Sequence, residues 1–142
     1  MEQQNYANHA RYVPLYHFVL FAIVIAINIL SVIHLTNDAS SGLIGSLLVE
    51  LIALSLLFTF FYSRLFALRV QDRAIRAEEN LRHFVMTGKL HDSRLTIRQL
   101  IGLRFASDEE YLSLAEEALE ENLSESDIKK MIKNWRGDYH RA

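Results

Sequence analysis

The stretch "YHFVLFAIVIAINILSVIHL", residues 16–35, carries no formally charged side chain at neutral pH. An α-helix of about 20 residues extends roughly 30 Å, the thickness of the hydrocarbon core of a bilayer. A second apolar run, "LIGSLLVELIALSLLFTFFY" at residues 43–62, contains one acid, Glu50, and only residues 36–42 separate the two runs. Because lipid offers no partners to backbone groups, the two runs predict a transmembrane helical hairpin with a tight turn.

Composition supports an all-α fold. The chain of 142 residues has one proline and five glycines, which leaves little material for turns between strands. It has no cysteine, which excludes disulfides, thiolate metal sites and a cysteine nucleophile. The long apolar runs lie in the first half of the chain and most of the charge lies in the second half.

Basic residues predict the orientation of the hairpin. The turn has no Lys or Arg, whereas one arginine precedes the first run and several follow the second: Arg11, then Arg64, Arg69, Arg73 and Arg76. The positive-inside rule therefore places both termini in the cytoplasm. We expect the first run to stay uncleaved, because it is too long for a signal peptide and the segment before it has little basic charge. The alternative, a soluble helical pair with a buried core, needs a larger partner surface than the tail supplies.

The residues before the first run are rich in rings with polar tips. They predict an interfacial anchor at headgroup depth, formed by Tyr6, His9, Arg11, Tyr12, Tyr16 and His17. An alternative is a pocket for a lipid headgroup or a quinone-type ligand, in which His9, Arg11 and His17 form the hydrogen bonds.

Polar residues inside the apolar runs predict a seam between the two helices. Asn28 and Glu50 each lie seven residues from the outer end of their run. Ser31 lies on the same helix face as Asn28, and Ser46 lies on the same helix face as Glu50. One hypothesis is structural: Glu50 forms hydrogen bonds across the hairpin or to another copy. The other is functional: Glu50 is a proton- or cation-linked site, which requires an oligomer or a larger partner.

The second span continues into a predicted stem helix that Gly88 ends. A heptad seam with spacings of 3, 4, 3, 4 and 3 runs along it: Ala67, Val70, Ala74, Ala77, Leu81 and Phe84. The pattern is short and rich in alanine. It predicts a helix that packs against the rest of the tail or pairs in a dimer.

Three shorter helices are predicted after the stem. Thr96 with Gln99 and Ser107 with Glu110 fit capping boxes, and Ser124 begins a helix that Gly137 closes. Two apolar faces form the expected core: Tyr111, Leu112, Ala115, Ala118 and Leu119, then Ile128, Met131, Ile132 and Trp135. In chain order, the predicted parts are an N-terminal segment (1–15), a first span (16–35), an external turn (36–42), a second span (43–63), a stem (64–88) and a small three-helix cytoplasmic domain (89–142).

Charge is segregated along this tail. Residues 64–106 carry a net charge of +5, residues 107–127 a net −9 and residues 128–142 a net +4. The basic stem suits anionic lipids of the inner leaflet. The acidic helix is expected to fold back on the basic helices or to face a partner, unless it is simply a solvated face. It also argues against nucleic acid, although the lysines of the last helix resemble a recognition helix.

No catalytic or metal-binding pattern was found. The sequence has no glycine-rich phosphate loop, no G-x-S-x-G and no H-E-x-x-H, and its six histidines never occur at helical i, i+3 or i+4 spacing. We therefore predict no cofactor and no enzymatic activity.

Several long motifs resemble one family: "QNYANHARYVPLYH" (4–17), "VQDRAIRAEENLRHF" (70–84), "HDSRLTIRQLIGLRFASDEEYLSLAEEALEENLS" (91–124) and "IKKMIKNWRGDYHR" (128–141). The chain resembles a domain-of-unknown-function family of small bacterial two-span membrane proteins, some of which are labelled transporter permeases. The resemblance implies a multi-pass protein of the bacterial inner membrane with a helical cytoplasmic tail, and it supplies no catalytic residue.

Two functions follow as expectations. The first is a non-enzymatic accessory or scaffold module that presents the charge-segregated tail to a partner, within a homo-oligomer or a larger membrane complex. The second is a transport-related oligomer that uses Glu50.

Overall fold

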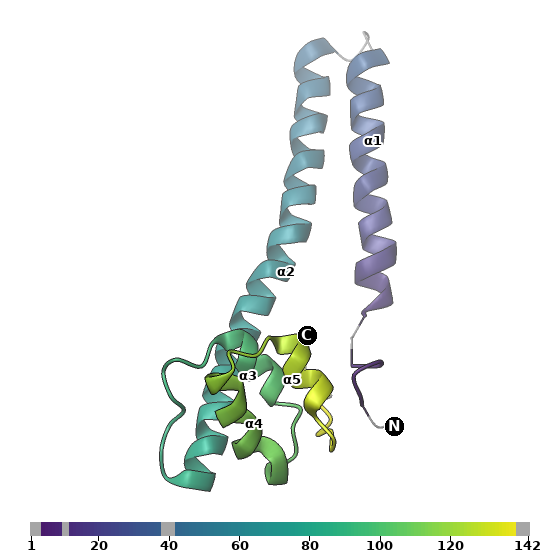
Figure 1. Ribbon diagram of the computed structural model, residues 1–142. Helices are drawn as coiled ribbons and strands as arrows, with labels where there is room; N and C mark the ends of the chain where they lie inside the picture. Colours follow the sequence, from purple (N-terminus) through teal and green to yellow (C-terminus); the bar gives the residue numbers. More distant parts are fainter. Residues whose placement is uncertain (1–3, 10–11, 38–41, 139–142) are drawn as a thin grey trace. The chain divides into compact units, whose positions relative to one another are not determined.

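The computed structural model describes residues 4–9, 12–37 and 42–138, and their regular structure is helical apart from one isolated β-bridge. This confirms the predicted all-α class for the described residues. In chain order the helices are the π-helix η1 (Leu15–Leu20), α1 (Phe21–Asn37), α2 (Gly42–Thr87), α3 (Ile97–Leu103), α4 (Asp108–Glu120) and α5 (Glu125–Met131) (Figure 1). Residues 38–41 of the predicted turn lie outside the described residues.

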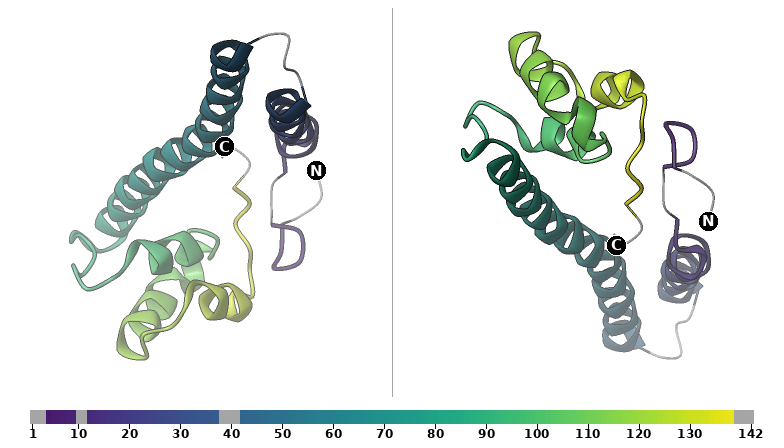
Figure 2. Two further views of the ribbon diagram at one scale, coloured as in Figure 1. Left: turned by 90° about the horizontal axis from the view of Figure 1, so that it is seen from above. Right: turned by 90° about the horizontal axis from the view of Figure 1, so that it is seen from below.

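The chain divides into two compact units. One, the hairpin unit, comprises Arg11–Ala67, and the other, the tail unit, comprises Met1–Ala10 together with Leu68–Ala142. Helix α2 is continuous and contributes residues to both units (Figure 2). It ends at Thr87, and Gly88 has a φ of +75°, so the predicted glycine stop is confirmed.

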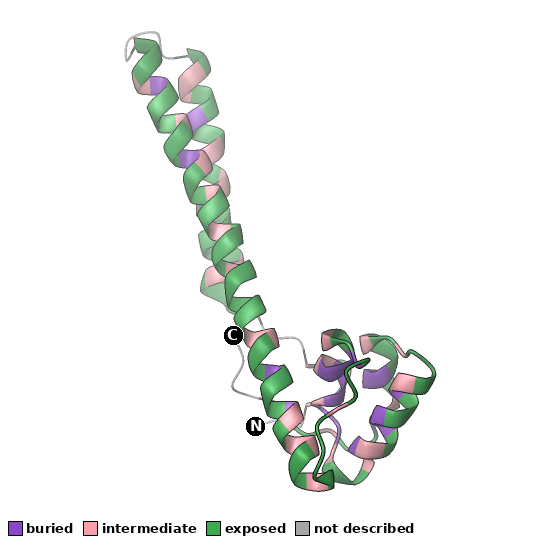
Figure 3. Cartoon of the chain, turned by 90° about the vertical axis from the view of Figure 1, so that its left-hand side faces the viewer, coloured by how far each residue is buried: buried purple, intermediate pink, exposed green. Residues whose placement is uncertain are grey.

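The hairpin unit buries very little apolar surface. Leu15–Asn37 and Gly42–Thr87 are each long and apolar enough to cross a membrane, yet only 11% of the most apolar stretch of either helix is buried. Figure 3 shows exposed residues along most of both helices. The buried residues are few and mostly small: Val24, Ser31, Ser46 and Ala53. Small side chains at these positions allow the two helices to approach closely.

The tail unit has a hydrophobic core of its own. Its fully buried large side chains come from α3, α4, α5 and the loops between them: Leu100, Leu103, Phe105, Tyr111 and Ile128. Gly102 lets α3 and α5 approach, because a Cβ atom there would lie 3.0 Å from Cγ2 of Ile128. The predicted core residues Leu112, Leu119, Met131 and Trp135 are only partly buried against this cluster, and Leu114 belongs to it although it was not predicted.

The predicted starts of α3 and α5 are confirmed, whereas the predicted capping box at α4 is wrong. Thr96 and Gln99 form a reciprocal capping box, and Ser124 accepts a hydrogen bond from the backbone of Asp127. Ser107 precedes α4 but forms no side-chain cap. Glu110 instead accepts hydrogen bonds from the backbone N–H groups of residues 133 and 134, at 3.1 and 3.0 Å.

The last helix is shorter than predicted. It ends at Met131, and Ile132 is extended, with φ −63° and ψ 121°. The chain beyond pairs with the α3–α4 connection through an antiparallel bridge between Ala106 and Trp135. Two backbone hydrogen bonds support this bridge, from Ser107 to the carbonyl of residue 134 and from residue 136 to the carbonyl of residue 105. The backbone groups that would extend α5 therefore form a tertiary contact instead.

The stem part of α2 packs against the rest of the tail unit, called here the tail domain (residues 89–138). It does so through a face other than the heptad seam. Ile75 and Glu79 are buried and Arg82 and Met86 are partly buried, at spacings of 4, 3 and 4. The larger residues of the seam are exposed: Val70, Leu81 and Phe84. Packing against the rest of the tail thus occurs as one alternative expected, but by a different set of residues.

Candidate functional site

The structure brings three residues of the polar seam into contact within the hairpin unit. The Ser31 hydroxyl donates to a carboxylate oxygen of Glu50 at 2.6 Å. The Asn28 amide donates to the carbonyls of Val24 at 2.8 Å and Ala53 at 3.2 Å. Ser46 is buried on the same helix as Glu50. These contacts satisfy polar groups that would otherwise be costly among apolar side chains.

The six residues predicted as one interfacial anchor fall into both units. Tyr6 and His9 belong to the tail unit, whereas Tyr12, Tyr16 and His17 belong to the hairpin unit. Arg11 lies outside the described residues. The shared interfacial anchor therefore stays a prediction, and its described members belong to two units.

Residues 4–9 dock on the tail domain. The Gln4 side chain exchanges two hydrogen bonds with the backbone of Asp138, at 2.8 and 3.2 Å. The Tyr6 hydroxyl lies 3.1 Å from the hydroxyl of Ser126. The His9 ring lies against Trp135, with ring centroids 5.8 Å apart, and His9 Nε2 lies 3.3 Å from the Lys129 amine. This segment is part of the tail fold.

An aromatic cavity of about 390 Å³ occurs in the hairpin unit. Its lining consists of aromatic and apolar groups with two basic side chains: Tyr16, His17, Phe21, Phe60, Phe61, Arg64 and Leu65. Tyr16 fixes one wall, because its ring stacks on Phe60 at 4.6 Å and its hydroxyl donates to the Phe60 carbonyl at 2.6 Å. Two of the lining residues come from η1, and π-helical turns are frequent at functional sites.

The other three arginines of the predicted membrane-proximal group are solvent-exposed. Arg69, Arg73 and Arg76 all lie on α2, and none of them has an ion-pair partner among the described residues. They do not converge on a cavity with Arg64. Their arrangement suits a diffuse interaction with negative charge better than a single ligand site.

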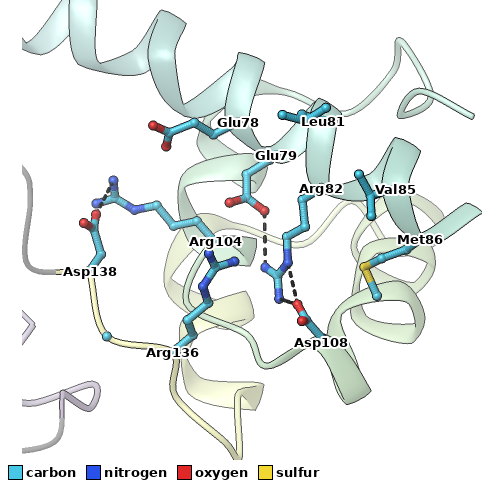
Figure 4. Close-up of a pocket in the computed structure, with 11 residues that line it drawn as sticks. Glu78, Glu79, Leu81, Arg82, Val85, Met86, Arg104, Asp108, Arg136 and Asp138 are labelled. Carbon is cyan, nitrogen blue, oxygen red and sulfur yellow. Dashed lines mark hydrogen bonds and ion pairs between the residues drawn. The ribbon is translucent and has the colours of Figure 1, made fainter.

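A larger cavity of about 680 Å³ lies in the tail unit, between the stem of α2 and the chain segments around residues 104–108 and 136–138 (Figure 4). Three arginines and four carboxylates line it, together with an apolar strip from α2: Arg82, Arg104, Arg136, Glu78, Glu79, Asp108, Asp138, Leu81, Val85 and Met86. None of the described lining residues carries a hydroxyl, thiol or imidazole group. This lining provides binding groups rather than a nucleophile with its base.

All three guanidinium nitrogens of Arg82 form hydrogen bonds within this cavity. Its Nε donates to Asp108 at 2.8 Å, a terminal nitrogen donates to the carbonyl of Ala106 at 2.8 Å, and the other donates to Glu79 at 3.3 Å. Its guanidinium lies 3.9 Å from the centre of the Tyr111 ring. The side chains of Arg82 and Glu79 are only 9% and 7% exposed. Arg82 therefore connects the stem to the domain and is not free to bind a ligand.

The remaining two arginines differ in their partners. Arg104 forms an ion pair with Asp138 at 2.9 Å, but its buried Nε has no hydrogen-bond partner in the described structure. Burial lowers the pKa of the Arg104 guanidinium and Asp138 partly offsets this effect. Arg136 projects between the Arg104–Asp138 pair and the Arg82 side chain in Figure 4, and it has no ion-pair partner among the described residues. Carboxylates occupy the same wall, so the cavity has no clear excess of positive charge.

A polar chain joins the stem, the loop after it and α4. His91 Nε2 lies 2.6 Å from the Tyr111 hydroxyl, and the rings of His83 and His91 lie 4.2 Å apart. Burial, and then the charge of His83, lower the pKa of His91 from 6.5 to about 4. Burial and the Glu79 carboxylate raise the pKa of Tyr111 far above its usual range. Both groups are therefore uncharged at neutral pH.

Sequence reasoning did not identify the tail cavity. From the sequence, Arg82 and Arg104 are visible only as basic charge in residues 64–106, and Arg136 only as a basic residue beside the lysines that resemble a recognition helix. The sequence signal that could have revealed the cavity is the face of α2 with spacings of 4, 3 and 4. On this face the charged residues Glu79 and Arg82 lie between the apolar residues Ile75 and Met86. No cluster of three or more metal-ligating side chains occurs among the described residues.

The described residues thus define an all-helical protein with two long apolar helices and a small helical domain. A model of a family of unknown function, DUF6526, matches residues 1–142, and the chain belongs to this family. The comparisons with curated proteins and with solved structures gave no match.

Proposed function

We propose that this chain is a membrane-anchored accessory or scaffold module without enzymatic activity. In this proposal the hairpin crosses the bacterial inner membrane, both termini lie in the cytoplasm, and the tail domain engages a partner protein. One observation carries the proposal: the hairpin exposes nearly all of its apolar side chains, whereas the tail unit buries a complete core of its own. An exposed apolar surface of this kind requires a lipid or protein environment.

The distribution of charge supports the orientation. Arg69, Arg73 and Arg76 are exposed on the stem just beyond the apolar part of α2, where anionic headgroups of the inner leaflet would lie. Negative lipids are thus expected to contact the stem, and the resemblance to two-span bacterial membrane proteins agrees with this placement.

The acidic residues of the tail separate into two groups. Asp108, Glu110 and Glu125 form hydrogen bonds or ion pairs inside the tail unit. The exposed acids on the second half of α4 and just after it have no ion-pair partner among the described residues: Glu116, Glu117, Glu120 and Glu121. The outward group is the surface that we assign to a basic region of the partner.

Topology is tested with single cysteines, because the natural chain has none. Thr36→Cys reports on the outer end of the hairpin and Ser113→Cys reports on an exposed position of α4. In intact spheroplasts a membrane-impermeant maleimide should label the first variant only, and the second should become labelled after permeabilisation. Recovery of the chain in the soluble fraction, or the reverse labelling pattern, would contradict the membrane placement.

The partner is tested by cross-linking in native membranes followed by mass spectrometry. The full chain is compared with a variant in which the four outward acids (Glu116, Glu117, Glu120 and Glu121) are replaced by glutamine, with Glu50→Gln as the control. A protein retained by the natural chain and the control, but lost with the four-site variant, supports the scaffold role. Identical cross-linked sets for all three chains would refute it.

The position of Glu50 within a long apolar helix raises one alternative, a transport-related oligomer. A carboxyl group in an apolar helix is expensive and frequently marks an ion pathway. In this alternative, Glu50→Gln abolishes proton-dependent flux in proteoliposomes and leaves the cross-linked partners unchanged. If Glu50→Gln leaves the flux intact, the carboxyl group is structural.

A further inference from the structure

The stem of α2 has two different faces. One, formed by Ile75, Glu79, Arg82 and Met86, packs against the tail domain. The heptad seam lies roughly 140° away around the helix, at about 100° per residue. Its larger side chains face solvent, with Val70 68%, Leu81 63% and Phe84 49% exposed. A continuous helix thus presents an apolar stripe whose large side chains are mostly exposed, although Leu81 also borders the tail cavity.

We infer that this stripe binds the same stripe of a second copy of the chain in a parallel, two-stranded coiled coil over residues 67–84. The inference goes beyond the proposed function, because it assigns the occupant of one defined face. A heptad spacing selects a helix as the partner, since only a supercoiled helix keeps its contacts along a 3.5-residue repeat. A second copy has an identical repeat, so that one symmetric interface covers the apolar stripes of both chains.

Charge complementarity selects the parallel orientation. With the seam at positions a and d, Arg73 occupies position g and Glu78 occupies position e. In a parallel coiled coil, position g of one helix lies next to position e five residues further along the other helix. Arg73 therefore faces Glu78 of the second copy, and the pair occurs twice by symmetry. Both side chains are exposed, and neither has an ion-pair partner among the described residues of its own chain.

The alanines of the seam keep the association weak. Ala67, Ala74 and Ala77 bury little area, so the stem alone provides only about two and a half heptads of contact. Confinement of two chains to one membrane raises their effective concentration and aligns their stems in parallel. The gain in effective concentration rests on the proposed membrane placement. The choice of the stripe as the interface and its heptad register do not depend on that placement.

The register is tested by disulfide cross-linking of single cysteines in native membranes. Ala74→Cys places a thiol at a seam position, and Arg76→Cys places one at an exposed position on another face of the same helix. Under mild oxidation, Ala74→Cys should form a covalent dimer in high yield, and Arg76→Cys should form at least about fivefold less. Equal yields would indicate random collision, and no dimer at either position would indicate that the stems do not meet. Either result overturns the inference.

A charge exchange tests the pairing itself in the Ala74→Cys background. Arg73→Glu and Glu78→Arg should each lower the dimer yield, because each creates two like-charge contacts across the interface; the expected loss is about tenfold at low salt. The double variant restores opposite charges and should restore the yield. Unchanged yields for the single variants, or no recovery in the double variant, would overturn the parallel register. Fluorescence of Trp135 reports whether each tail stays folded.

The two proposals fail in different ways. If the chain is soluble but Ala74→Cys still forms the dimer selectively, the membrane placement is wrong and the stem interface stands. If the chain is membrane-bound and cross-links only through a cysteine in the hairpin, such as Leu48→Cys, the stem interface is wrong. Cross-linking of Ala74→Cys to a different protein also refutes it.

Discussion

Arg82 connects the stem helix to the tail domain, and its replacement by methionine is the most informative single perturbation. Methionine keeps the apolar part of the side chain and removes the guanidinium. The variant loses the hydrogen bonds to Asp108, Glu79 and the carbonyl of Ala106. It also loses the cation–π contact with Tyr111. The tail unit should therefore be destabilised without any change in the hairpin unit.

The expected cost follows from the unequal burial of the two acidic partners. Asp108 is 71% exposed and regains water, so its loss of a partner costs little. The Glu79 side chain is 7% exposed and would keep an uncompensated charge. Such a loss costs about 3–5 kcal/mol, and we expect the lower end of this range, about 3 kcal/mol. A small domain is stable by only about 5–15 kcal/mol, so this effect is large.

The lone tryptophan makes the measurement specific to the tail. Trp135 packs against Phe105 with ring centroids 5.1 Å apart, so its fluorescence reports unfolding of the tail unit in detergent-solubilised full chain. Arg82→Met should lower the urea midpoint by about 2 M. The control Arg94→Met removes an exposed ion pair and should leave the midpoint unchanged.

A second variant separates lost packing from the stranded charge. Adding Glu79→Gln to Arg82→Met removes the uncompensated carboxylate and should recover about 2 kcal/mol. The slope of urea unfolding is about 1–2 kcal/mol per M. A shift of the midpoint by less than about 0.5 M in Arg82→Met would therefore refute the assignment of Arg82 as the main connection. A double variant less stable than the single one would refute the role given to Glu79.

Three further predictions concern the tail unit. The pKa of His91 falls from 6.5 to about 4 on folding, so the unfolded chain binds more protons between these values and stability is lost as pH falls from 6.5 to 4. Because the ring is half-exposed, the expected loss in the free energy of unfolding is only about 1–2 kcal/mol. Urea titrations at pH 7 and pH 5 should show a smaller difference in stability for His91→Gln than for the natural chain. Gly102→Ala places a Cβ atom 3.0 Å from Cγ2 of Ile128 and should cost about 1–3 kcal/mol in the same titration. Gln4→Ala removes both hydrogen bonds to Asp138, so amide exchange should accelerate at residues 4–9 while the urea midpoint falls only slightly. Unchanged exchange at residues 4–9 would mean that Gln4 does not hold the N-terminal segment.

Local patterns in the sequence predicted the elements of this fold well. The helix stop at Gly88 and the starts at Thr96 and Ser124 depend on backbone conformation and neighbouring side chains, which sequence spacing records directly. The contact between Ser31 and Glu50 was also accessible, because equal depth in an antiparallel pair follows from counting residues.

Long-range contacts were not accessible in the same way. The helix predicted through Trp135 ends early because its backbone pairs with Ala106, about thirty residues away, and no local signal marks that pairing. Tyr6 and His9 look like interfacial residues by composition, yet their contacts in the described structure are with the tail domain. Amphipathic rings suit a membrane interface and a half-buried protein surface equally well.

The polar seam shows how the two functional hypotheses depend on assembly. Within one hairpin the Ser31 hydroxyl and the Asn28 amide are both used, and Glu50 accepts a hydrogen bond from Ser31. A single hairpin thus accounts for these groups as structural contacts and encloses no pathway. Transport through Glu50 requires a further hairpin beside the first, and a parallel stem dimer would bring one there. Loss of flux in the Arg73→Glu variant, with Glu50 intact, would therefore mean that transport through Glu50 depends on the stem dimer. Flux that persists without the stem dimer would mean that the two are independent.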